Sequence, residues 1–537
     1  MTTDRSKTFD IEVFNHLFTS VAEEMGVSVQ QSSYSPNIKE RLDHSCAIFD
    51  RSGKMLAQAA HIPVHLGSMP ASVSAAIESY GKAKPASGDV LILNDPYMGG
   101  THLPDITTVS PVFVGRRTSK TQWGWVATRA HHADIGGMAP GSMPPSTEIF
   151  HEGLVIPPLK LVDAGVLDTQ LVEIICRNVR TPDERSGDLS AQLASHQIGE
   201  SRIAALADRY GAQTLTEKAK TLLEYTQRLA QTRLKRIPNG SYGFSDFLDD
   251  DGLGGEPAKI SLLLSVDEGR LHFDFSGTTA AVAGAMNAPE SVTHSAAIYV
   301  ARCLMGADVP ANEGVAAALT FTIPPDSLLA PRSPHAVSAG NVETSQRIVD
   351  TIWGALSQAL PDVIPAASQG TMNNLIIGGY DSIRNRPFSY YETIGGGSGG
   401  GPFGPGADGI QVAMTNTRNT PIEALELAYP LLAKRYELGR ASGGSGRHVG
   451  GSGIIRELVA LVPSVATVIT ERRLRPPWGS AGGQPGNCGL NKVTRRSGRS
   501  QKLPGKTTFS LEAGDRIRID TPGGGGWGPP NKTGQTI

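Results

Sequence analysis

The sequence predicts a mixed α/β protein of the α+β type, built from several packed units. Its 537 residues are more than one hydrophobic core accommodates, so several units are expected. Stretches with helical periodicity and stretches of short β-rich runs both occur along the chain, which indicates helices and strands together. Glycine is frequent, with 62 residues and most of the excess in the last third. Hydrophobic runs separate these glycines, which indicates loops of a folded unit.

Changes in residue pattern divide the chain into five predicted segments. A hairpin-rich N-terminal part carries candidate metal ligands and is followed by a helical connector. A β-rich unit comes next, marked by strand-like runs at residues 260–266 and 271–275. A unit of helices and glycine-rich loops then precedes a C-terminal β-rich unit. The predicted bounds, in this order, are residues 1–195, 196–240, 241–330, 331–440 and 441–537.

Three stretches have the spacing of helices. Apolar residues three and four positions apart predict a helix over residues 9–25, with Gly26 as its stop. Residues 195–236 are helix-prone with charged faces, and the turn signal Pro238-Asn-Gly240 ends them. Residues 348–360 form an apolar helical segment between glycine-rich loops. These segments account for the helical part of the predicted fold.

Two β-hairpins are predicted in the N-terminal part. Residues 46–50 and 55–59 are short apolar runs on either side of a polar turn sequence that contains glycine. Residues 107–114 and 123–130 are β-rich and are also separated by a polar segment. Between the two hairpins, residues 89–94 have the composition of a buried strand. Candidate metal ligands lie at the open ends of both hairpins.

Potential metal ligands gather at the open end of the second hairpin. His102 and Asp105 come just before its first strand, and His131 and His132 come just after its second strand. Antiparallel pairing makes the residues at these two ends neighbours in space. Asp105 and His131 should therefore lie side by side, with His102 on the preceding loop. Because His131 and His132 are adjacent, strand alternation sends their rings to opposite faces, and at most one ligates directly.

The first hairpin repeats this arrangement. Its pairing places Asp43 and His44 beside His61, with His65 one short loop away. A single histidine is more often a packed or surface residue than a ligand. Five of the 13 histidines, however, lie between residues 61 and 132. A set that includes Asp43, together with the ligands of the second hairpin, suits a borderline or hard divalent ion with an open water position.

Other candidate sites have weaker signals. Ile394–Gly401 resembles a backbone anion cradle, but it lacks the lysine and serine or threonine of a phosphate loop. A tight packed loop is an equally good interpretation. Arginines at 440–447 and at 472–473 offer positive charge for a phosphate or a carboxylate, with a solvated surface as the default. No nucleophile elbow of the Gly-x-Ser-x-Gly type is present.

Composition and charge exclude several classes of function. The net charge of −2 and a pI near 6.7 give no basic footprint for nucleic acid or an anionic membrane. No signal peptide and no apolar stretch of membrane-spanning length is found. The cysteines are far apart, which argues against a thiolate zinc site and a disulfide scaffold. They are Cys46, Cys176, Cys303 and Cys488. A cytoplasmic protein is expected.

Long motifs across nearly the whole chain resemble the hydantoinase B/oxoprolinase family. The matching segments are Leu42–Asp50, Ala60–Met69, Leu93–Asp105, Ala130–Gly137, Glu152–Pro158, Thr181–Leu189, Gly340–Gln346, Met414–Pro421 and Thr521–Trp527. The family is similar to the β half of ATP-dependent N-methylhydantoinases, 5-oxoprolinases and caprolactamases. It is also similar to one subunit of acetone and acetophenone carboxylases.

The resemblance implies a cofactor, a partner and a ligand set. The B-like chain holds a divalent metal, for which we expect zinc, manganese or iron. Its ligands fall on Asp43, His102, Asp105 and His131. A hydantoinase A-like partner with an acetate-kinase-like fold binds and hydrolyses ATP, so a hetero-oligomer acting on a small cyclic amide is expected. The chain departs from the family at His132, where relatives often carry an aromatic residue.

The resemblance to this family also implies a mechanism. ATP phosphorylates the amide oxygen in the partner, and this subunit positions a water on the metal to attack the activated carbon of the lactam or imide. His132 is expected to contact the substrate or intermediate, with packing alone as the alternative. Asp134 or Asp95 is expected to orient a ligating histidine. Two alternative functions remain: a subunit of an ATP-dependent ketone carboxylase, and a non-catalytic structural partner of the ATP-binding chain.

Overall fold

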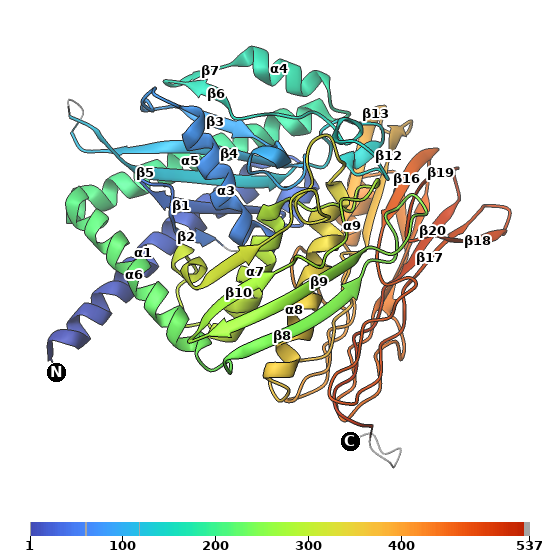
Figure 1. Ribbon diagram of the computed structural model, residues 1–537. Helices are drawn as coiled ribbons and strands as arrows, with labels where there is room; N and C mark the ends of the chain where they lie inside the picture. Colours follow the sequence, from blue (N-terminus) through green and yellow to red (C-terminus); the bar gives the residue numbers. More distant parts are fainter. Residues whose placement is uncertain (1, 60–61, 117–118, 531–537) are drawn as a thin grey trace.

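The computed structural model describes residues 2–59, 62–116 and 119–530, and in these residues the chain forms helices together with four sheets. This confirms the predicted mixed α/β class. In Figure 1 the N-terminal sheet, blue to cyan, lies on one side of the molecule and the C-terminal sheets, orange to red, on the other. Helices and a four-stranded sheet, coloured green to yellow, lie between them. Among the described helices, none has both the length and the apolar character needed to cross a bilayer.

The N-terminal sheet has seven strands in the order β2-β1-β5-β4-β3-β6-β7. Both predicted hairpins and the predicted buried strand are confirmed. The pairing of β1 with β5 joins the two hairpins, with His44 opposite Ala130. The open ends of both hairpins therefore lie together at one edge. The strands are β1 (His44–Asp50), β2 (Met55–Ala59), β3 (Val90–Leu93), β4 (Asp105–Val114), β5 (Thr121–His131), β6 (Leu159–Asp163) and β7 (Val166–Leu167).

Helices pack against this sheet. Helices α1 (Thr2–Ser32) and α5 (Pro182–Tyr210) contact each other and share a buried core with β1 and β5. Helix α3 (Pro63–Ser79) contributes Met69 and Val73 to a separate core with other side chains of the same strands. The shorter helices of this part are α2 (Pro36–Lys39), α4 (Thr169–Arg177), and the 3-10 turns η1 (Pro96–Met98), η2 (Pro140–Ser142) and η3 (Ile149–His151).

Two predicted helix boundaries were wrong. Helix α1 does not stop at Gly26 but continues to Ser32. Val29 is fully buried and extends the apolar stripe of the helix by one turn, and this burial outweighs the roughly 1 kcal/mol that a glycine costs inside a helix. The helix-prone stretch predicted to start at 195 begins earlier, because α5 starts at Pro182. Gly211, with φ +88°, separates α5 from α6 (Ala212–Leu234).

The central sheet has the order β11-β10-β9-β8. Its strands β9 and β10 confirm the strand-like runs predicted at residues 260–266 and 271–275. Helix α8 packs on β8 and β9, and α7 packs between α3 and α8. A π-helical turn, η5 (Gly340–Thr344), leads directly into α8. The elements are β8 (Gly240–Phe247), β9 (Lys259–Asp267), β10 (Arg270–Asp274), α7 (Glu290–Met305), η4 (Glu313–Ala318), β11 (Leu319–Thr322) and α8 (Ser345–Ala359).

Two further sheets form the C-terminal part, in the orders β13-β12-β16-β19 and β14-β15-β20-β17-β18. They share one buried core. The elements are β12 (Asn374–Asp381), β13 (Arg386–Glu392), α9 (Ile422–Ala428), β14 (Leu431–Leu438), β15 (Ile454–Ala460), β16 (Ser464–Ile469), β17 (Leu490–Thr494), β18 (Ser500–Leu503), β19 (Lys506–Leu511) and β20 (Arg516–Asp520).

The glycine-rich segments pack backbone against backbone. The amide of Gly397 donates to the carbonyl of Pro522 at 3.0 Å, and the amide of Gly400 donates to the carbonyl of Gly525 at 2.8 Å. The amide of Gly451 donates to the carbonyl of Ser398 at 2.8 Å. These amides are therefore already used, and the anion cradle considered for this loop is not supported. Glycine is needed here because the segments approach too closely for side chains.

We expect Gly451→Ala to destabilise the protein by about 1–3 kcal/mol, the usual range for overpacking. A Cβ at this position would lie 2.0 Å from the carbonyl oxygen of Ala407, which is backbone and cannot rotate away. Thermal unfolding measures the effect. Gly404→Ala is the matched control, because a Cβ there meets no atom within 4 Å. Equal melting temperatures for the two variants would contradict the close-packing explanation.

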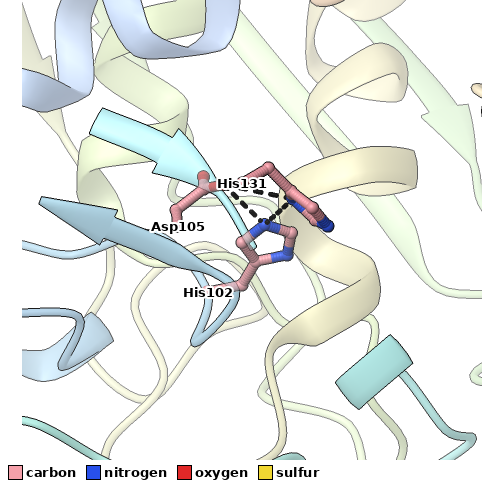
Figure 2. Close-up of side chains that lie close together, drawn as sticks. All are labelled: His102, Asp105 and His131. Carbon is pink, nitrogen blue, oxygen red and sulfur yellow. Dashed lines mark hydrogen bonds and ion pairs between the residues drawn. The ribbon is translucent and has the colours of Figure 1, made fainter. Parts of the chain in front are cut away.

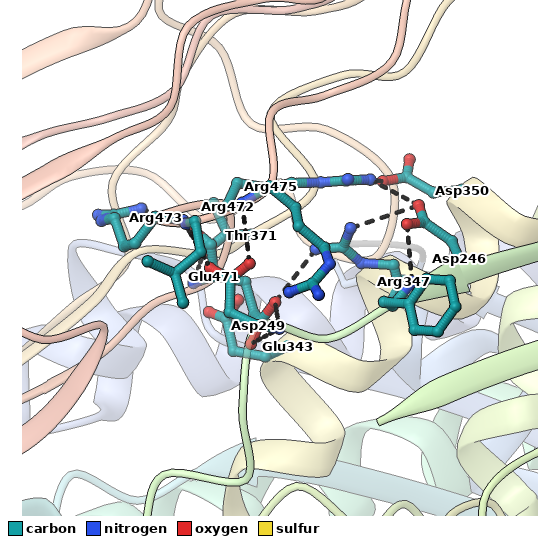
Figure 3. Close-up of polar contacts among 12 residues, drawn as sticks. Asp246, Asp249, Glu343, Arg347, Asp350, Thr371, Glu471, Arg472, Arg473 and Arg475 are labelled. Atoms are coloured by element: carbon teal, nitrogen blue, oxygen red, sulfur yellow. Dashed lines mark hydrogen bonds and ion pairs between the residues drawn. The ribbon is translucent and has the colours of Figure 1, made fainter. Parts of the chain in front are cut away.

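A buried ion network joins the central and C-terminal parts (Figure 3). Arg472 contacts Asp246 at 2.8 Å and Asp350 at 2.5 Å, and Arg347 bridges Asp246 and Glu471 at 3.3 and 3.2 Å. Arg472 and Arg347 are at most 1% exposed. The solvated surface expected for the arginine at 472 was wrong, because internal carboxylates neutralise its charge.

Candidate metal centre

Three side chains meet at the edge of the N-terminal sheet where the two hairpins open (Figure 2). Asp105 begins β4 and pairs directly with His131 at the end of β5. His102 precedes β4 on a turn whose backbone is tied by the Asp105 amide donating to the His102 carbonyl at 3.1 Å. The register predicted from the hairpin is confirmed, and it brings an imidazole against a carboxylate from the neighbouring strand.

The facing atoms of the cluster are evenly spaced. His102 Nε2 lies 3.1 Å from Asp105 Oδ1 and 3.2 Å from His131 Nδ1, and His131 Nδ1 lies 3.2 Å from Asp105 Oδ1. Two ligands that each lie ~2.1 Å from one tetrahedral ion are ~3.4 Å apart. Imidazole nitrogen with carboxylate oxygen is a donor set for zinc, manganese or iron. The geometry and chemistry of these three residues fit a divalent ion.

Contacts around His102 determine which ring nitrogen faces the cluster. His102 Nδ1 lies 3.2 Å from the carbonyl oxygen of Ser338. A carbonyl only accepts, so Nδ1 carries a hydrogen and Nε2 is the ring nitrogen that would bind a metal. The Ser338 segment is held by Glu152, whose Oε1 accepts from the amides of Val337 and Ser338 at 3.0 Å each. Burial raises the pKa of Glu152 to about 7.

Charge within the cluster also suits a cation. Burial raises the pKa of Asp105, but the positive charge of His102 and hydrogen bonds from neighbouring histidines outweigh burial, and the pKa ends well below its ordinary range. Burial lowers the pKa of His131 to about 4. At neutral pH Asp105 is therefore ionised and His131 is neutral. Burial lowers the pKa of His102, but the negative charge of Asp105 and its hydrogen bond outweigh burial and raise that pKa, so a metal that binds at Nε2 would displace the proton from this ring.

Asp43 lies beside the cluster but outside its closest group. Its carbonyl oxygen accepts from the His131 amide at 3.0 Å, which ties the two hairpin ends together. Its carboxylate lies 4.0 Å from Arg41 Nη1. Burial raises the pKa of Asp43, and Arg41 partly offsets this effect. Among the described residues, the ligand atoms within 4.8 Å of one another belong to His102, Asp105 and His131.

A fourth imidazole approaches from α3. His65 Nε2 lies 3.5 Å from Asp105 Oδ2, and its Nδ1 lies 3.0 Å from Ser45 Oγ. Sequence reasoning placed His65 near the hairpin ends without giving it a role. His44 Nε2 instead meets the carbonyl of Gly26 at 3.1 Å. His61, which was expected beside Asp43, lies outside the described residues.

His132 and Asp134 contact other parts of the chain. His132 Nε2 lies 3.0 Å from Gln192 Oε1 on α5, so its ring is on the opposite side of the strand, as alternation predicts. Burial lowers its pKa to about 4. Asp134 Oδ2 pairs with Arg180 at 2.9 Å, and the Asp95 carboxylate accepts from the Tyr97 amide. These contacts favour packing and loop anchoring over direct participation in the cluster.

Two residues that sequence reasoning missed complete the site. The ring of Tyr391, on β13, stacks on His131 with centroids 4.7 Å apart and planes 20° apart. Asn341, in the π-helical turn η5, has its Nδ2 3.1 Å from His102 Nε2 and 3.3 Å from Asp105 Oδ2. Asn341 lies in one of the quoted family motifs, which was the available signal. Tyr391 has no local signal.

The cluster is closed to solvent. His102 is fully buried, and Asp105 and His131 are 1% and 3% exposed. A surface cavity of about 970 Å³ lies elsewhere, along α6 and η4, and includes none of these side chains. Any ligand must therefore reach the cluster from within the protein or by movement of the segments that cover it.

Fold and site together define a mixed α/β protein with a buried candidate metal centre made of two histidines and an aspartate. The chain belongs to the hydantoinase B/oxoprolinase family, whose model matches residues 7–530. It is 42% identical to an uncharacterised protein of Methanocaldococcus jannaschii, over 97% of this chain and 90% of that protein. It is 40% identical to 5-oxoprolinase 1 of Arabidopsis thaliana, over 96% of this chain but only 41% of that protein.

Solved structures share the fold. An ATP-dependent caprolactamase from Pseudomonas jessenii has a TM-score of 0.88 at 26% identity, over 97% of this chain and 91% of that chain. An acetone carboxylase in its nucleotide-free state has a TM-score of 0.89 over 98% of this chain and 76% of that chain. Its 19% identity establishes a common fold alone.

Proposed function

We propose that this chain is the metal-bearing subunit of an ATP-dependent hydrolase of cyclic amides. The observation that carries the proposal is the buried group of His102, Asp105 and His131, with facing atoms 3.1–3.2 Å apart. Membership of the hydantoinase B/oxoprolinase family and similarity to a caprolactamase support the reaction class. The intact ligand set argues against a purely structural partner.

A second chain is proposed to supply ATP chemistry. This chain spans about two fifths of the length of the plant 5-oxoprolinase to which it is similar. The glycine-rich loop at 394–401 uses its amides internally and has no phosphate-loop lysine. A hydantoinase A-like partner would phosphorylate the amide oxygen, which removes the resonance that protects an amide carbonyl.

The residues of this chain would then hydrolyse the activated amide. A divalent ion held by His102, Asp105 and His131, with Asp43 adjacent, would lower the pKa of water from about 16 toward about 7. Ser338 holds the His102 ring in orientation through Nδ1. Burial lowers the pKa of His65, so its ring is neutral beside Asp105 at neutral pH. Exclusion of bulk water protects the activated amide until it reaches the cluster.

Co-purification with the ATP-binding partner tests this function. With hydantoin, 5-oxoproline or caprolactam, we expect phosphate release and a ring-opened acid only when both chains and ATP are present. The isolated chain should not bind ATP by calorimetry. Tight ATP binding to the isolated chain would contradict the division of labour. Bicarbonate-dependent consumption of a ketone, without amide hydrolysis, would identify the carboxylase alternative instead.

A further inference from the structure

We propose that Asn341 is an additional ligand of the metal centre, and that its side-chain oxygen binds the cation after a half-turn of the amide. The proposal rests on the proposed function only in requiring a divalent ion at His102, Asp105 and His131. It adds a residue from the π-helical turn η5 to a site otherwise built from the N-terminal sheet.

The side-chain amide of Asn341 lies against His102 and Asp105 of the cluster. It is 3% exposed, and its Nδ2 lies 3.1 Å from His102 Nε2 and 3.3 Å from Asp105 Oδ2. The backbone of the turn packs closely against Asn287: a Cβ added to the preceding Gly340 would lie only 1.9 Å from the Asn287 carbonyl oxygen. The amide end of Asn341 therefore stands at the same distance from His102 as the other ligand atoms do.

The other end of the same amide has no partner. Asn341 Oδ1 is buried and makes no hydrogen bond to any described residue. An unpaired buried acceptor costs about 1–3 kcal/mol. The two ends of an amide have nearly the same shape, so a half-turn about the last side-chain bond exchanges oxygen and nitrogen without repacking.

Binding of a cation favours this exchange. In its neutral form His102 carries its hydrogen on Nδ1, so the lone pair on Nε2 accepts from the Asn341 N–H. A metal ion at the cluster takes that lone pair, and the N–H would then point at a positive charge. After the half-turn, the oxygen points at the ion from the position that the nitrogen now occupies. In a buried site this attraction is stronger than it would be in water, and it opposes the loss of the two N–H contacts. Amide oxygen is an accepted ligand for hard and borderline cations.

The test compares two substitutions of similar size in the full-length protein. Asn341→Asp keeps an oxygen at the end of the side chain, whereas Asn341→Leu removes both polar atoms. Affinity for Mn²⁺ and Zn²⁺ is measured by competition with a chelating dye, and the visible spectrum of the Co²⁺ form reports the ligand set. We expect Asn341→Leu to weaken binding by about 10–100-fold, as loss of groups around a metal does, and to alter the Co²⁺ spectrum. Asn341→Asp should bind at least as tightly as the unchanged protein.

Stability without metal provides a second readout. In Asn341→Asp a new carboxylate faces Asp105, so the metal-free variant should melt at a lower temperature and gain more on adding Mn²⁺ than the unchanged protein. Equal weakening by both substitutions would show that the N–H group matters, and would overturn the proposal. Unchanged affinity in Asn341→Leu would also overturn it. If the unchanged protein binds no divalent ion, both this proposal and the metal-based function fail. Metal binding without amide hydrolysis removes only the function.

Discussion

Replacing His131 by alanine is expected to empty the metal centre and to lower turnover by about a hundredfold or more, whereas replacing the adjacent His132 leaves the metal in place. His131 Nδ1 lies within 3.2 Å of both Asp105 Oδ1 and His102 Nε2. His132 faces α5 and contacts Gln192. Two neighbouring positions of the same residue type therefore have opposite roles.

Metal content and turnover separate these roles. The two variants are purified with the ATP-binding partner, and metal is measured by elemental analysis alongside ATP-dependent hydrolysis. His132→Ala removes a buried ring and should lower the melting temperature without a comparable loss of rate. A large loss of rate in His132→Ala with metal retained would restore the substrate-contacting role expected from its sequence position. An empty site in His132→Ala with a full site in His131→Ala would refute the ligand assignment.

The core of the site could be predicted because it depends on local pairing. A hairpin has one register that places its apolar residues on a common face, and this register alone makes Asp105 and His131 neighbours. The alternation of side chains along a strand likewise predicted that the rings of His131 and His132 lie on opposite faces. By contrast, the end of α1 was wrong because the burial of Val29 overrides the local signal of Gly26.

The outer part of the site depends on contacts that no local pattern encodes. Asn341 is more than 200 positions from His102 along the chain, and Tyr391 reaches His131 from a different sheet. Asp134 was expected to orient a ligating histidine, but its carboxylate pairs with Arg180. Likewise, a run of glycines has the same composition whether its amides bind an anion or another backbone segment.

The ion network between the central and C-terminal parts predicts a large effect on stability. Arg472→Met should lower the free energy of unfolding by about 3–5 kcal/mol, the range for breaking a buried ion pair. Without the guanidinium, the carboxylates of Asp246 and Asp350 remain buried with less positive charge beside them. Arg475→Met is the matched control, since the Arg475 guanidinium lies over the ring of Phe247, 5.6 Å from its centroid. Such a contact is worth about 1 kcal/mol.

The pH dependence of this effect gives a sharper test. Burial raises the pKa of Asp350 even with Arg472 present, and removal of Arg472 should raise it further. A carboxyl whose pKa is higher in the folded than in the unfolded state binds more protons when folded, so its folded form gains stability as pH falls. The loss in free energy of unfolding caused by Arg472→Met, measured by urea unfolding, should therefore become smaller as the pH falls from 8 to 5. Adding Asp350→Asn to this variant should recover part of the lost stability at pH 8. A deficit that is independent of pH, or an Arg475→Met variant that is equally unstable, would mean that lost packing rather than unpaired charge destabilises the protein.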